Sequence, residues 1–431
     1  MKARSSLEKG QSMVLIVLGI FVLFGFTALA IDGGMVYSDR RNAQNAADAA
    51  ALAAGLQKAN LKNDQVAKRA AEYSVMGNGF KKSQITVTIT PFVEMFTNYI
   101  RVHVELTSTT ETMFAKMFTS GPMVNNVVAD VIVRPSQAAM PGMAIVAMGN
   151  CLTSGDELIG VAGGGNSGGV LSYSGGIFVN TPESGSNDCA IEPGSSANHW
   201  GIMAEEPYDI WSIGSYNYDG EDNLGPLPVH TNVNGGVPLS DPLPITDLPE
   251  PVCTKSGTKD PDTGHLRPGN WQGAQIKGTL DPGIYCISGD LNSAGNDSVF
   301  GNGVVLYFKD GGMRFSGNGD LTLTAPTDAN CQGDSGLATE SCTYKNIAIY
   351  VSHSNSSAID LAGNGLYKIT GLVYNLNGVF HAKGGGTSED EWVVNGQVIA
   401  SSVLGDGGGS FVVTFDAGNT YWSTVKLWLD K

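Results

Sequence analysis

An uncharged apolar stretch near the N-terminus constrains this chain more than any other feature. Residues 13–31 contain no charged side chain, and Asp32 follows them. As a helix they span about 28 Å, close to the thickness of a bilayer's hydrocarbon core. Lys2, Arg4 and Lys9 precede the stretch. Because positively charged flanks stay on the cytoplasmic side, we predict a single-pass anchor with the N-terminus inside and the rest of the chain outside.

A cleaved secretory signal is the alternative interpretation of this stretch. Residues 27–30 offer small side chains at the spacing of a signal-peptidase site. Secretory signals, however, have shorter apolar cores than this one. We therefore predict an uncleaved anchor in the cytoplasmic membrane, with the bulk of the chain extracytoplasmic or at the cell surface. The sequence leaves a periplasm and an open exterior as alternatives.

Beyond the anchor the chain is acidic and rich in glycine. The full sequence has a formal net charge of −16 and 57 glycines among its 431 residues. A negative surface repels nucleic acid, so nucleic-acid binding is excluded. Most of the glycines lie in the C-terminal two thirds, interleaved with asparagine, serine and short β-branched runs. That mixture is not the composition of a flexible linker.

All six cysteines follow the anchor, and an even number in a non-cytoplasmic segment indicates disulfides. No two of them form a C-x-x-C motif, which argues against a zinc site. Six cysteines allow fifteen connectivities, which the sequence does not resolve. The pairing that we expect joins neighbours in chain order: Cys151 with Cys189, Cys253 with Cys286, and Cys331 with Cys342.

The segment after the anchor predicts a long helix. Residues 38–56 are rich in alanine and contain no helix breaker before Gly55. Small residues recur at four-residue spacing, on two lines that are Ala43, Ala47, Ala51 and Ala46, Ala50, Ala54. Such a face lets another helix approach closely. Alanine is also simply the best helix former, and the sequence leaves both interpretations open.

Strand patterns follow this helix. Residues 85–90 and 100–106 alternate apolar and polar side chains, 127–133 predicts a third strand, and 112–118 predicts a short helix. We therefore expect a small α+β module over residues 32–137, with one face of its sheet against the long helix.

A family resemblance lies in the segment that joins the anchor to the alanine-rich helix. The stretch IDGGMVY at 31–37 leads to Arg40-Arg41 and then to NAADAAALA at 45–53. These residues closely resemble the N-terminal region of TadG-like (TadE/TadG family) proteins of Flp, or tight adherence, pilus-assembly systems. The pattern of residues 99–133 is similar to theirs as well. The resemblance covers about residues 10–135. It implies an inner-membrane-anchored, outward-facing protein whose partners are other pilus-assembly or pseudopilin subunits.

Two family motifs are incomplete in this chain. Residues 8–12 loosely resemble a prepilin cleavage site, which would be cut between Gly10 and Gln11. A major pilin carries glutamate five residues later, where this chain has Leu15, so packing as a major subunit is disfavoured. Many TadG-like proteins also continue into a von Willebrand A domain with a metal-binding D-x-S-x-S motif. That motif is missing after residues 144–147, and we predict no metal site.

From about residue 158 short apolar runs alternate with Gly/Asn turns, and no helix-length periodicity appears. Asn318 and Asn364 lie in two similar stretches 46 residues apart, which we interpret as two rungs of 23 residues. Such repeats predict a right-handed parallel β-helix over residues 138–431, with a β-sandwich as the alternative. The proline-rich residues 225–268 are expected to be an excursion packed along it. The cytoplasmic tip and anchor, residues 1–31, complete the predicted domains.

Catalytic signals are weak. His353 and His381 are isolated among residues of no catalytic pattern, and no phosphate loop is present. Trp392, Trp422 and Trp428 could stack on sugars, but for Trp422 and Trp428 a cap that closes one end of a solenoid is favoured. We therefore predict neither enzymatic activity nor a cofactor.

Three functions remain after these exclusions. The leading hypothesis is a membrane-anchored structural protein of Flp/Tad-type pilus assembly or surface adhesion. The alternatives are a membrane-tethered carbohydrate-binding or carbohydrate-active β-helix protein, whose partners would include surface glycans, and a processed pilin-like filament subunit.

Overall fold

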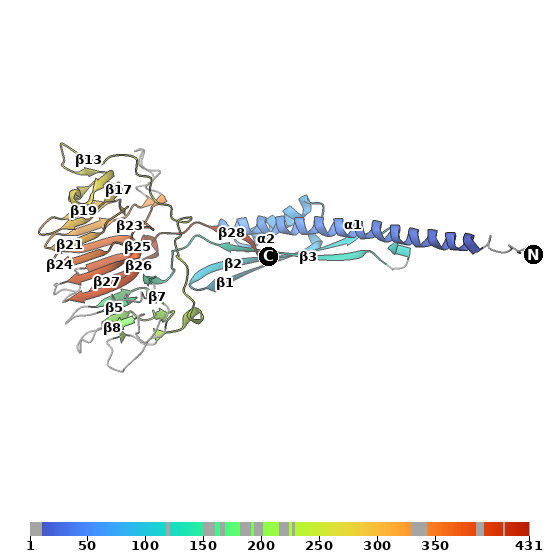
Figure 1. The fold of residues 1–431 in the computed structure, drawn as a ribbon, viewed down its shortest axis with the longest axis horizontal. Coiled ribbons are helices and arrows are strands. Elements are labelled where there is room, and N and C mark those ends of the chain that lie inside the picture. The colour runs from blue at the N-terminus through green and yellow to red at the C-terminus, as the bar shows by residue number, and fades with distance from the viewer. Residues whose placement is uncertain are drawn as a thin grey trace, which may run out of the picture. The chain divides into compact units, whose positions relative to one another are not determined.

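The chain divides into two compact units. A computed structural model describes residues 11–117, 121–149, 160–163, 169–181, 191–193, 201–214, 224–225, 229–328, 343–384, 392–407 and 410–430. The N-terminal unit comprises residues 1–136 together with 424–431, and the β-rich unit comprises residues 137–423. Figure 1 traces both along the chain.

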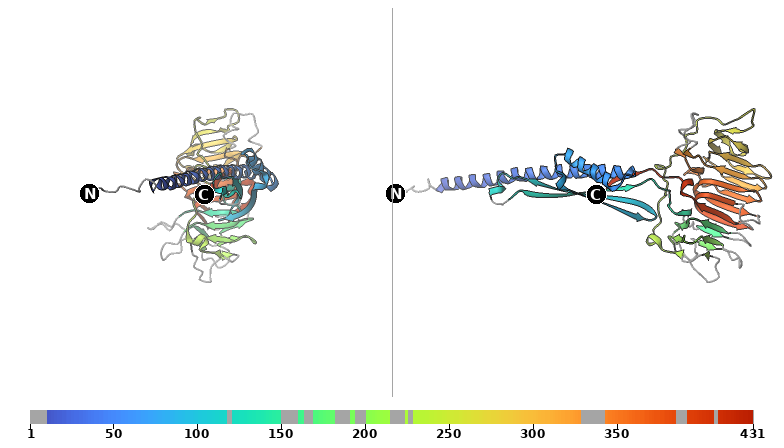
Figure 2. Two further views of the ribbon diagram at one scale, coloured as in Figure 1. Left: turned by 90° about the vertical axis from the view of Figure 1, so that its right-hand side faces the viewer. Right: turned by 180° about the vertical axis from the view of Figure 1, so that it is seen from behind.

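A single long helix, α1 (Gln11–Ala59), joins the apolar stretch to the alanine-rich segment without a break. Its first half extends past the rest of the N-terminal unit (Figures 1 and 2). After a short turn, α2 (Asp64–Gly77) packs against the second half. The Asn63 side chain caps α2 by accepting a hydrogen bond from the Val66 N–H at 3.0 Å.

An antiparallel sheet supports α1. Its strand order is β1 (Ile85–Glu94), β2 (Thr97–Thr110), β3 (Met123–Arg134) and β28 (Lys426–Asp430). Alternate residues of β2 and β3, among them Val104 and Val131, are buried against α1 and α2, as an amphipathic sheet requires. The turns η1 (Lys82–Gln84) and η2 (Ala115–Met117) complete this unit.

Two sequence-based expectations are corrected in this unit. The helix predicted over residues 112–118 is only the three-residue 3₁₀ turn η2. Trp428 does not cap the β-rich domain, because it lies in β28 and pairs with Ile132 of β3. The last strand of the chain therefore belongs to the first folded unit, a return that no local pattern indicates.

The β-rich unit is built from short strands that pair almost entirely in parallel. From β16 to β22 each strand pairs with the strand three places further along the chain, and so do β4 to β7. The strands before the proline-rich segment are β4 (Met143–Ala147), β5 (Val161–Gly163), β6 (Val170–Tyr173), β7 (Gly176–Val179), β8 (Ile191–Pro193), β9 (Ile202–Ala204), β10 (Ile210–Ser212), β11 (Leu224–Gly225) and β12 (Val229–His230).

The strands after that segment continue the same pattern. They are β13 (Thr258–Lys259), β14 (Leu266–Arg267), β15 (Gly269–Gln272), β16 (Gly278–Leu280), β17 (Gly283–Ser288), β18 (Leu291–Ser293), β19 (Val299–Asn302), β20 (Val304–Phe308), β21 (Met313–Gly317), β22 (Leu321–Thr324), β23 (Ile347–Val351), β24 (Ile359–Gly363), β25 (Tyr367–Gly384), β26 (Trp392–Gly407) and β27 (Phe411–Phe415). The described residues of this unit also form the 3₁₀ turns η3 (Val233–Gly236), η4 (Gly273–Gln275) and η5 (Ala417–Asn419).

The order of strands in space differs from their order in the chain. β26 pairs with β25 on one side and with β4 and β5 on the other, and β27 pairs with β6. The last strands of this unit, red in Figure 1, thus lie between its green and its orange strands. Because they occupy the middle of the stack, no cap at one end is formed by this part of the chain.

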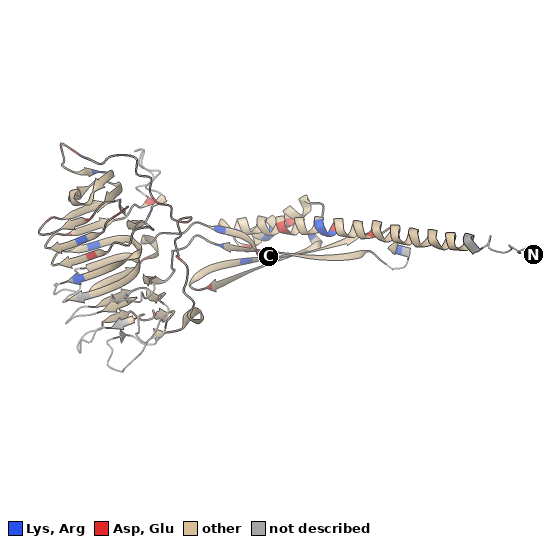
Figure 3. Ribbon diagram, in the orientation of Figure 1, with Lys and Arg blue, Asp and Glu red and all other residues tan. Residues whose placement is uncertain are grey.

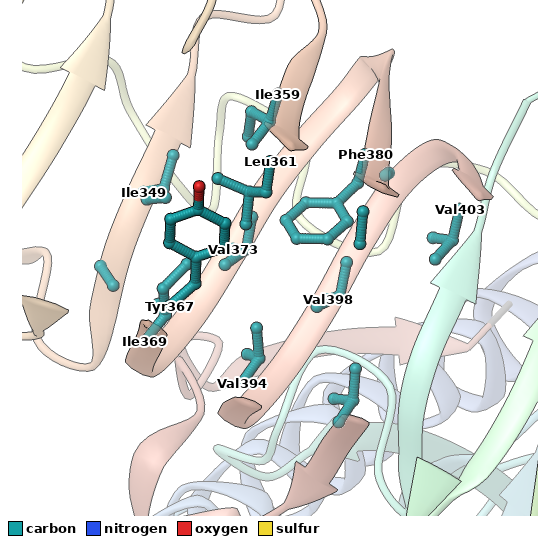
Figure 4. Close-up of a cluster of buried hydrophobic side chains, with 14 of the residues drawn as sticks. Ile349, Ile359, Leu361, Tyr367, Ile369, Val373, Phe380, Val394, Val398 and Val403 are labelled. Carbon is teal, nitrogen blue, oxygen red and sulfur yellow. The ribbon is translucent and has the colours of Figure 1, made fainter. Parts of the chain in front are cut away.

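Interior side chains come from successive strands and pack face to face. Val373, Phe380 and Val398 lie with similar residues of β23 to β26 in one continuous cluster of buried apolar side chains (Figure 4). Their burial removes apolar surface from water in each layer, which is the main stabilising contribution to such a stack.

The glycine–asparagine turns stack directly on one another. Gly317 of β21 pairs with Gly363 of β24, and Asn364 N–H donates to the Gly317 carbonyl at 2.8 Å. The 46-residue spacing of Asn318 and Asn364 is therefore one step of the stack and not two, a correction to the sequence-based interpretation. A Cβ on Gly363 would overlap the Gly317 carbonyl oxygen, so the close approach of the two backbones requires glycine there.

Candidate functional site

The apolar half of α1 is the first element of the candidate site. Among the described residues it is the one helix long and apolar enough to cross a membrane. Its large side chains from Met13 to Phe26 are exposed, so no other described part of the chain covers them. Figure 3 shows no charged residue on this part of the helix. A surface of this size is stable when lipid surrounds it.

Asp32 marks the end of the apolar stretch and is buried, with 4% of its surface exposed. Its carboxylate accepts three backbone hydrogen bonds from the first residue of η2 and the two residues before it: Met113 N–H at 2.8 Å, Phe114 N–H at 3.0 Å and Ala115 N–H at 2.5 Å. Burial raises the pKa of Asp32, but these three donors outweigh it and leave the pKa below its ordinary value. The carboxylate caps the turn at the end of the β2–β3 hairpin.

Asp39 lies two helical turns further along the same face of α1. Its carboxylate oxygen Oδ2 accepts hydrogen bonds from Ser108 Oγ at 2.6 Å, Thr110 Oγ1 at 2.9 Å and Asn125 Nδ2 at 3.1 Å. Burial raises the pKa of Asp39, and the three side-chain donors lower it further than burial raises it. We call Asp32 and Asp39 the aspartate clasp, because both hold the same hairpin end on α1.

Sequence reasoning missed this role for both aspartates. The sequence marks Asp32 only as the residue that ends the anchor, and its local pattern does not single out Asp39. Their spacing of seven residues places them on one helix face, which is the signal that could have found them. The donors, however, lie about seventy to eighty residues further along the chain.

The alanine lines form the face of α1 that the rest of the N-terminal unit covers. Ala43, Ala46, Ala47, Ala50, Ala51 and Ala54 are all fully buried. They share one apolar cluster with Ala67, Ala71 and Val75 of α2 and with side chains of β2 and β3. The helix that approaches this face closely is therefore α2 of the same chain.

The remaining predicted positions are placed as follows. Gly10 lies outside the described residues, and Gln11, the first described residue, belongs to α1. Cys253 and Cys286 form a disulfide with 6.1 Å between their Cα atoms. The other cysteines, Cys151, Cys189, Cys331 and Cys342, lie outside the described residues.

The proline-rich segment packs across the outside of the stacked strands of the β-rich unit. We call residues 231–257 the return strap, because they carry the chain from β12 to β13. Along its length the strap contacts the residue after β7 and then β25, β23, β20 and β17. These contacts are Leu239 with Asn180, Asp241 with Tyr374, Leu248 with Tyr350, Glu250 with Tyr307, and the disulfide from Cys253 to Cys286. Two of its leucines, Leu243 and Leu248, are fully buried.

His353 is the centre of the strap contacts, and it is not isolated as its sequence neighbours suggested. Its Nε2 lies 3.3 Å from Asp241 Oδ2, and its backbone N–H donates to Glu250 Oε1 at 3.0 Å. The hydrogen bond with Asp241 raises the pKa of His353, and burial opposes this effect. For His381, the second histidine considered in the sequence, Nδ1 lies 3.5 Å from Asp360 Oδ1. Among the described residues no His, Cys, Asp and Glu side chains form a group suited to a metal ion.

Comparison with known proteins bears on the anchoring helix. Residues 10–59 match the family model described as putative Flp pilus-assembly TadE/G-like. The match confirms the resemblance predicted for the N-terminal region, and it coincides with α1. It supports a structural role related to a pilus and fits a single-pass membrane anchor. No curated protein and no solved structure matches the chain.

Proposed function

We propose that this chain is a single-pass, membrane-anchored structural protein of Flp/Tad-type pilus assembly or surface adhesion, without enzymatic activity. The observation that carries the proposal is the coincidence of the pilus-assembly family match with α1, whose first half exposes apolar side chains over a membrane-spanning length. Other pilus-assembly or pseudopilin subunits are its expected partners.

The arrangement that we propose has the N-terminus inside and both folded units outside the membrane. Lys2, Arg4 and Lys9 before the anchor support this orientation. Residues 1–31 would be the cytoplasmic tip and anchor, 32–137 the TadE/TadG-like module and 138–431 a right-handed parallel β-helix. The parallel pairing of strands β4–β7 and β16–β22 with strands three places further along the chain supports the β-helix.

Cell fractionation tests the proposal. A C-terminal tag is added, cells are sheared, and filaments and washed membranes are blotted, with N-terminal sequencing of each band. Full-length protein confined to membranes, together with loss of piliation or adhesion on deletion, is expected. Protein in the cytoplasmic fraction, or unchanged piliation and adhesion on deletion, would contradict it.

The processed filament subunit is the second candidate, because residues 8–12 resemble a prepilin cleavage site between Gly10 and Gln11. A band that begins at Gln11 in the sheared fraction would establish this second function and displace the first.

A further inference from the structure

A groove lies between α1 and the end of the β2–β3 hairpin. It encloses about 510 Å³ and is open along one side. Its walls are mostly apolar or small, as at Leu29, Phe114 and Met123, and the polar residues Asp32 and Asn125 also line it. At Gly25 and Gly33 no atom lies within 4 Å of the place a Cβ would take. Because these glycines have no side chain, that space belongs to the groove.

The aspartate clasp fixes the position of this groove relative to the membrane-spanning segment of α1. The apolar stretch ends at residue 31, and Asp32 binds the backbone of Met113, Phe114 and Ala115. The hairpin end is therefore held level with the end of the membrane-spanning segment. Along α1 the groove runs from Gly25 to Arg40, about 22 Å at the helical rise. It thus begins at a depth where lipid tails lie and ends above it.

The hairpin end carries apolar side chains that the N-terminal unit leaves exposed. Met113 is 67% and Val124 60% exposed, and Phe114 and Met123 are partly exposed beside them. Four apolar side chains gathered at the height of a bilayer surface are typical of a segment that enters the headgroup and acyl boundary.

Arg40 gives the groove one charged end. Its side chain is exposed, and among the described residues it has no ion pair. The nearby carboxylates of Asp32 and Asp39 are already engaged, each by three donors. The guanidinium is therefore available to a phosphate, which it binds with charge-assisted hydrogen bonds.

We propose that this groove binds one phospholipid of the outward-facing leaflet, with an acyl chain against Gly25–Val36 and the phosphate at Arg40. The inference rests on the proposed membrane anchoring. From Gly25 to Val36 the α1 lining is apolar or small except for Asp32, whose carboxylate is bound to the hairpin backbone, and Arg40 lies at the other end of the groove. This order, apolar at the anchor end and cationic at the far end, matches an amphiphile. A second transmembrane helix in the groove would match its apolar part but would leave the Arg40 guanidinium without an anionic partner. The hairpin end thus becomes a second membrane contact, which restricts rotation and tilt of the anchor relative to its sheet.

Brominated lipids test the position of the hairpin end. Full-length protein is placed in nanodiscs whose acyl chains carry bromine, which quenches tryptophan at contact range. Val124→Trp puts the probe at the hairpin end. Val93→Trp is the matched control, because Val93 is also an exposed valine, 67% exposed, and lies at the opposite end of the same sheet. Leu23→Trp reports whether the anchor itself is in lipid. Wild-type protein provides the background of the native tryptophans.

The expected result is strong quenching of the added fluorescence in Val124→Trp and Leu23→Trp, and none in Val93→Trp. Quenching of Leu23→Trp alone would overturn the lipid groove and leave the anchor intact. Absence of quenching in both Val124→Trp and Leu23→Trp would contradict the proposed membrane anchoring as well. If quenching of Val124→Trp falls as the protein-to-lipid ratio rises, a second copy occupies the groove, and the lipid assignment is wrong.

Arg40 is tested separately by phosphatidylglycerol titration of the detergent-solubilised full-length protein, read by native mass spectrometry. Arg40→Gln should weaken binding about ten-fold, the scale of one charge-assisted hydrogen bond. Arg41→Gln is the control, since the neighbouring arginine does not line the groove. Equal effects of the two substitutions would show only general attraction of a basic helix for an anionic lipid, and would overturn the site.

Discussion

Replacing Asp39 with alanine tests whether the aspartate clasp holds the hairpin end. The substitution removes the acceptor that Ser108, Thr110 and Asn125 share, and all three side chains are buried. Asn125 Nδ2 keeps its second hydrogen bond, to Thr110 Oγ1 at 3.1 Å. Two hydroxyl groups, of Ser108 and Thr110, are left without the acceptor that they use in the wild type.

The expected cost follows from these two hydroxyls. A buried donor that loses its partner costs about 1–3 kcal/mol, so the hairpin end should lose roughly 3 kcal/mol of local stability. At about 1.4 kcal/mol per factor of ten, that raises the population of the open hairpin end about 100-fold. The rest of the N-terminal unit keeps its buried alanine face and should change little.

Hydrogen exchange of full-length protein in detergent, read by mass spectrometry, is the suitable assay. Peptides that cover residues 105–112 and 122–128 should exchange about 100-fold faster in Asp39→Ala, on the estimate from two unpaired hydroxyls. Peptides of β1 should not change. Glu111→Ala is the control, because Glu111 lies at the same hairpin end but is 68% exposed in its ion pair with Lys116. Such a pair contributes about 0–1 kcal/mol.

The pH of the measurement matters. Burial raises the pKa of Asp39, yet its three donors leave it below the ordinary value. A carboxylate with a lowered folded pKa contributes stability that is present above the unfolded pKa of about 3.9 and lost as pH falls through the folded pKa. At pH 7 the clasp is therefore at full strength. If Asp39→Ala then speeds exchange no more than Glu111→Ala, the clasp does not hold the hairpin.

Three further predictions concern the β-rich unit. Gly363→Ala should destabilise it by about 2–4 kcal/mol, because φ is +100° there and a Cβ would meet the Gly317 carbonyl; an unchanged urea midpoint would contradict this. Replacing both Cys253 and Cys286 by serine opens a loop of 33 residues and should cost about 3–4 kcal/mol on the chain-entropy model, again read from the urea midpoint, with no loss disproving the contribution. The pKa of His353 is raised, so its contact with Asp241 stabilises the strap fully below the unfolded pKa of about 6.5 and weakens as pH rises through the folded pKa. Amide hydrogen exchange of the strap, corrected for intrinsic rates, should therefore increase across that range in wild type but not in His353→Gln. Equal pH profiles of the two proteins would refute this prediction.

Local patterns in the sequence predict much of the N-terminal unit. The apolar stretch and the alanine lines belong to α1, alternating residues mark β1 and β2, and a run rich in valine marks β3. These elements follow from hydrophobic periodicity, which short windows of sequence contain. The family resemblance lies in the same region and is confirmed over residues 10–59.

What the sequence could not predict depends on pairing between distant segments. β28 is a five-residue strand whose partner β3 lies about three hundred residues earlier, and nothing within residues 426–430 identifies that partner. The clasp depends on the register that brings Met113 to Asp32. By length alone, the 46 residues from Asn318 to Asn364 fit two rungs of 23 residues, whereas strands β21 and β24 pair directly across them.

The return strap explains features of the sequence that otherwise have separate interpretations. β4 lies beside β26, and from there the strands run outward to β12, which pairs only with β10 among the described strands. From β14 onward the strands run back from the opposite end to β25 and β26. The chain must therefore cross the whole stack between β12 and β13. A proline-rich, extended segment suits that path, because it cannot join the sheet that it crosses.

The same topology determines when the stack becomes complete. β25 and β26 supply the pairing that joins the outward half, which starts at β4, to the inward half, which ends at β24. Until β26 is in place, the edges of both halves expose unpaired backbone, which is a template for aggregation. The strap lies across the inward half through its contacts with Tyr374, Tyr350, Tyr307 and Cys286. By tethering that half along its length, it keeps the two edges of one chain close together and so favours their joining over pairing with another copy.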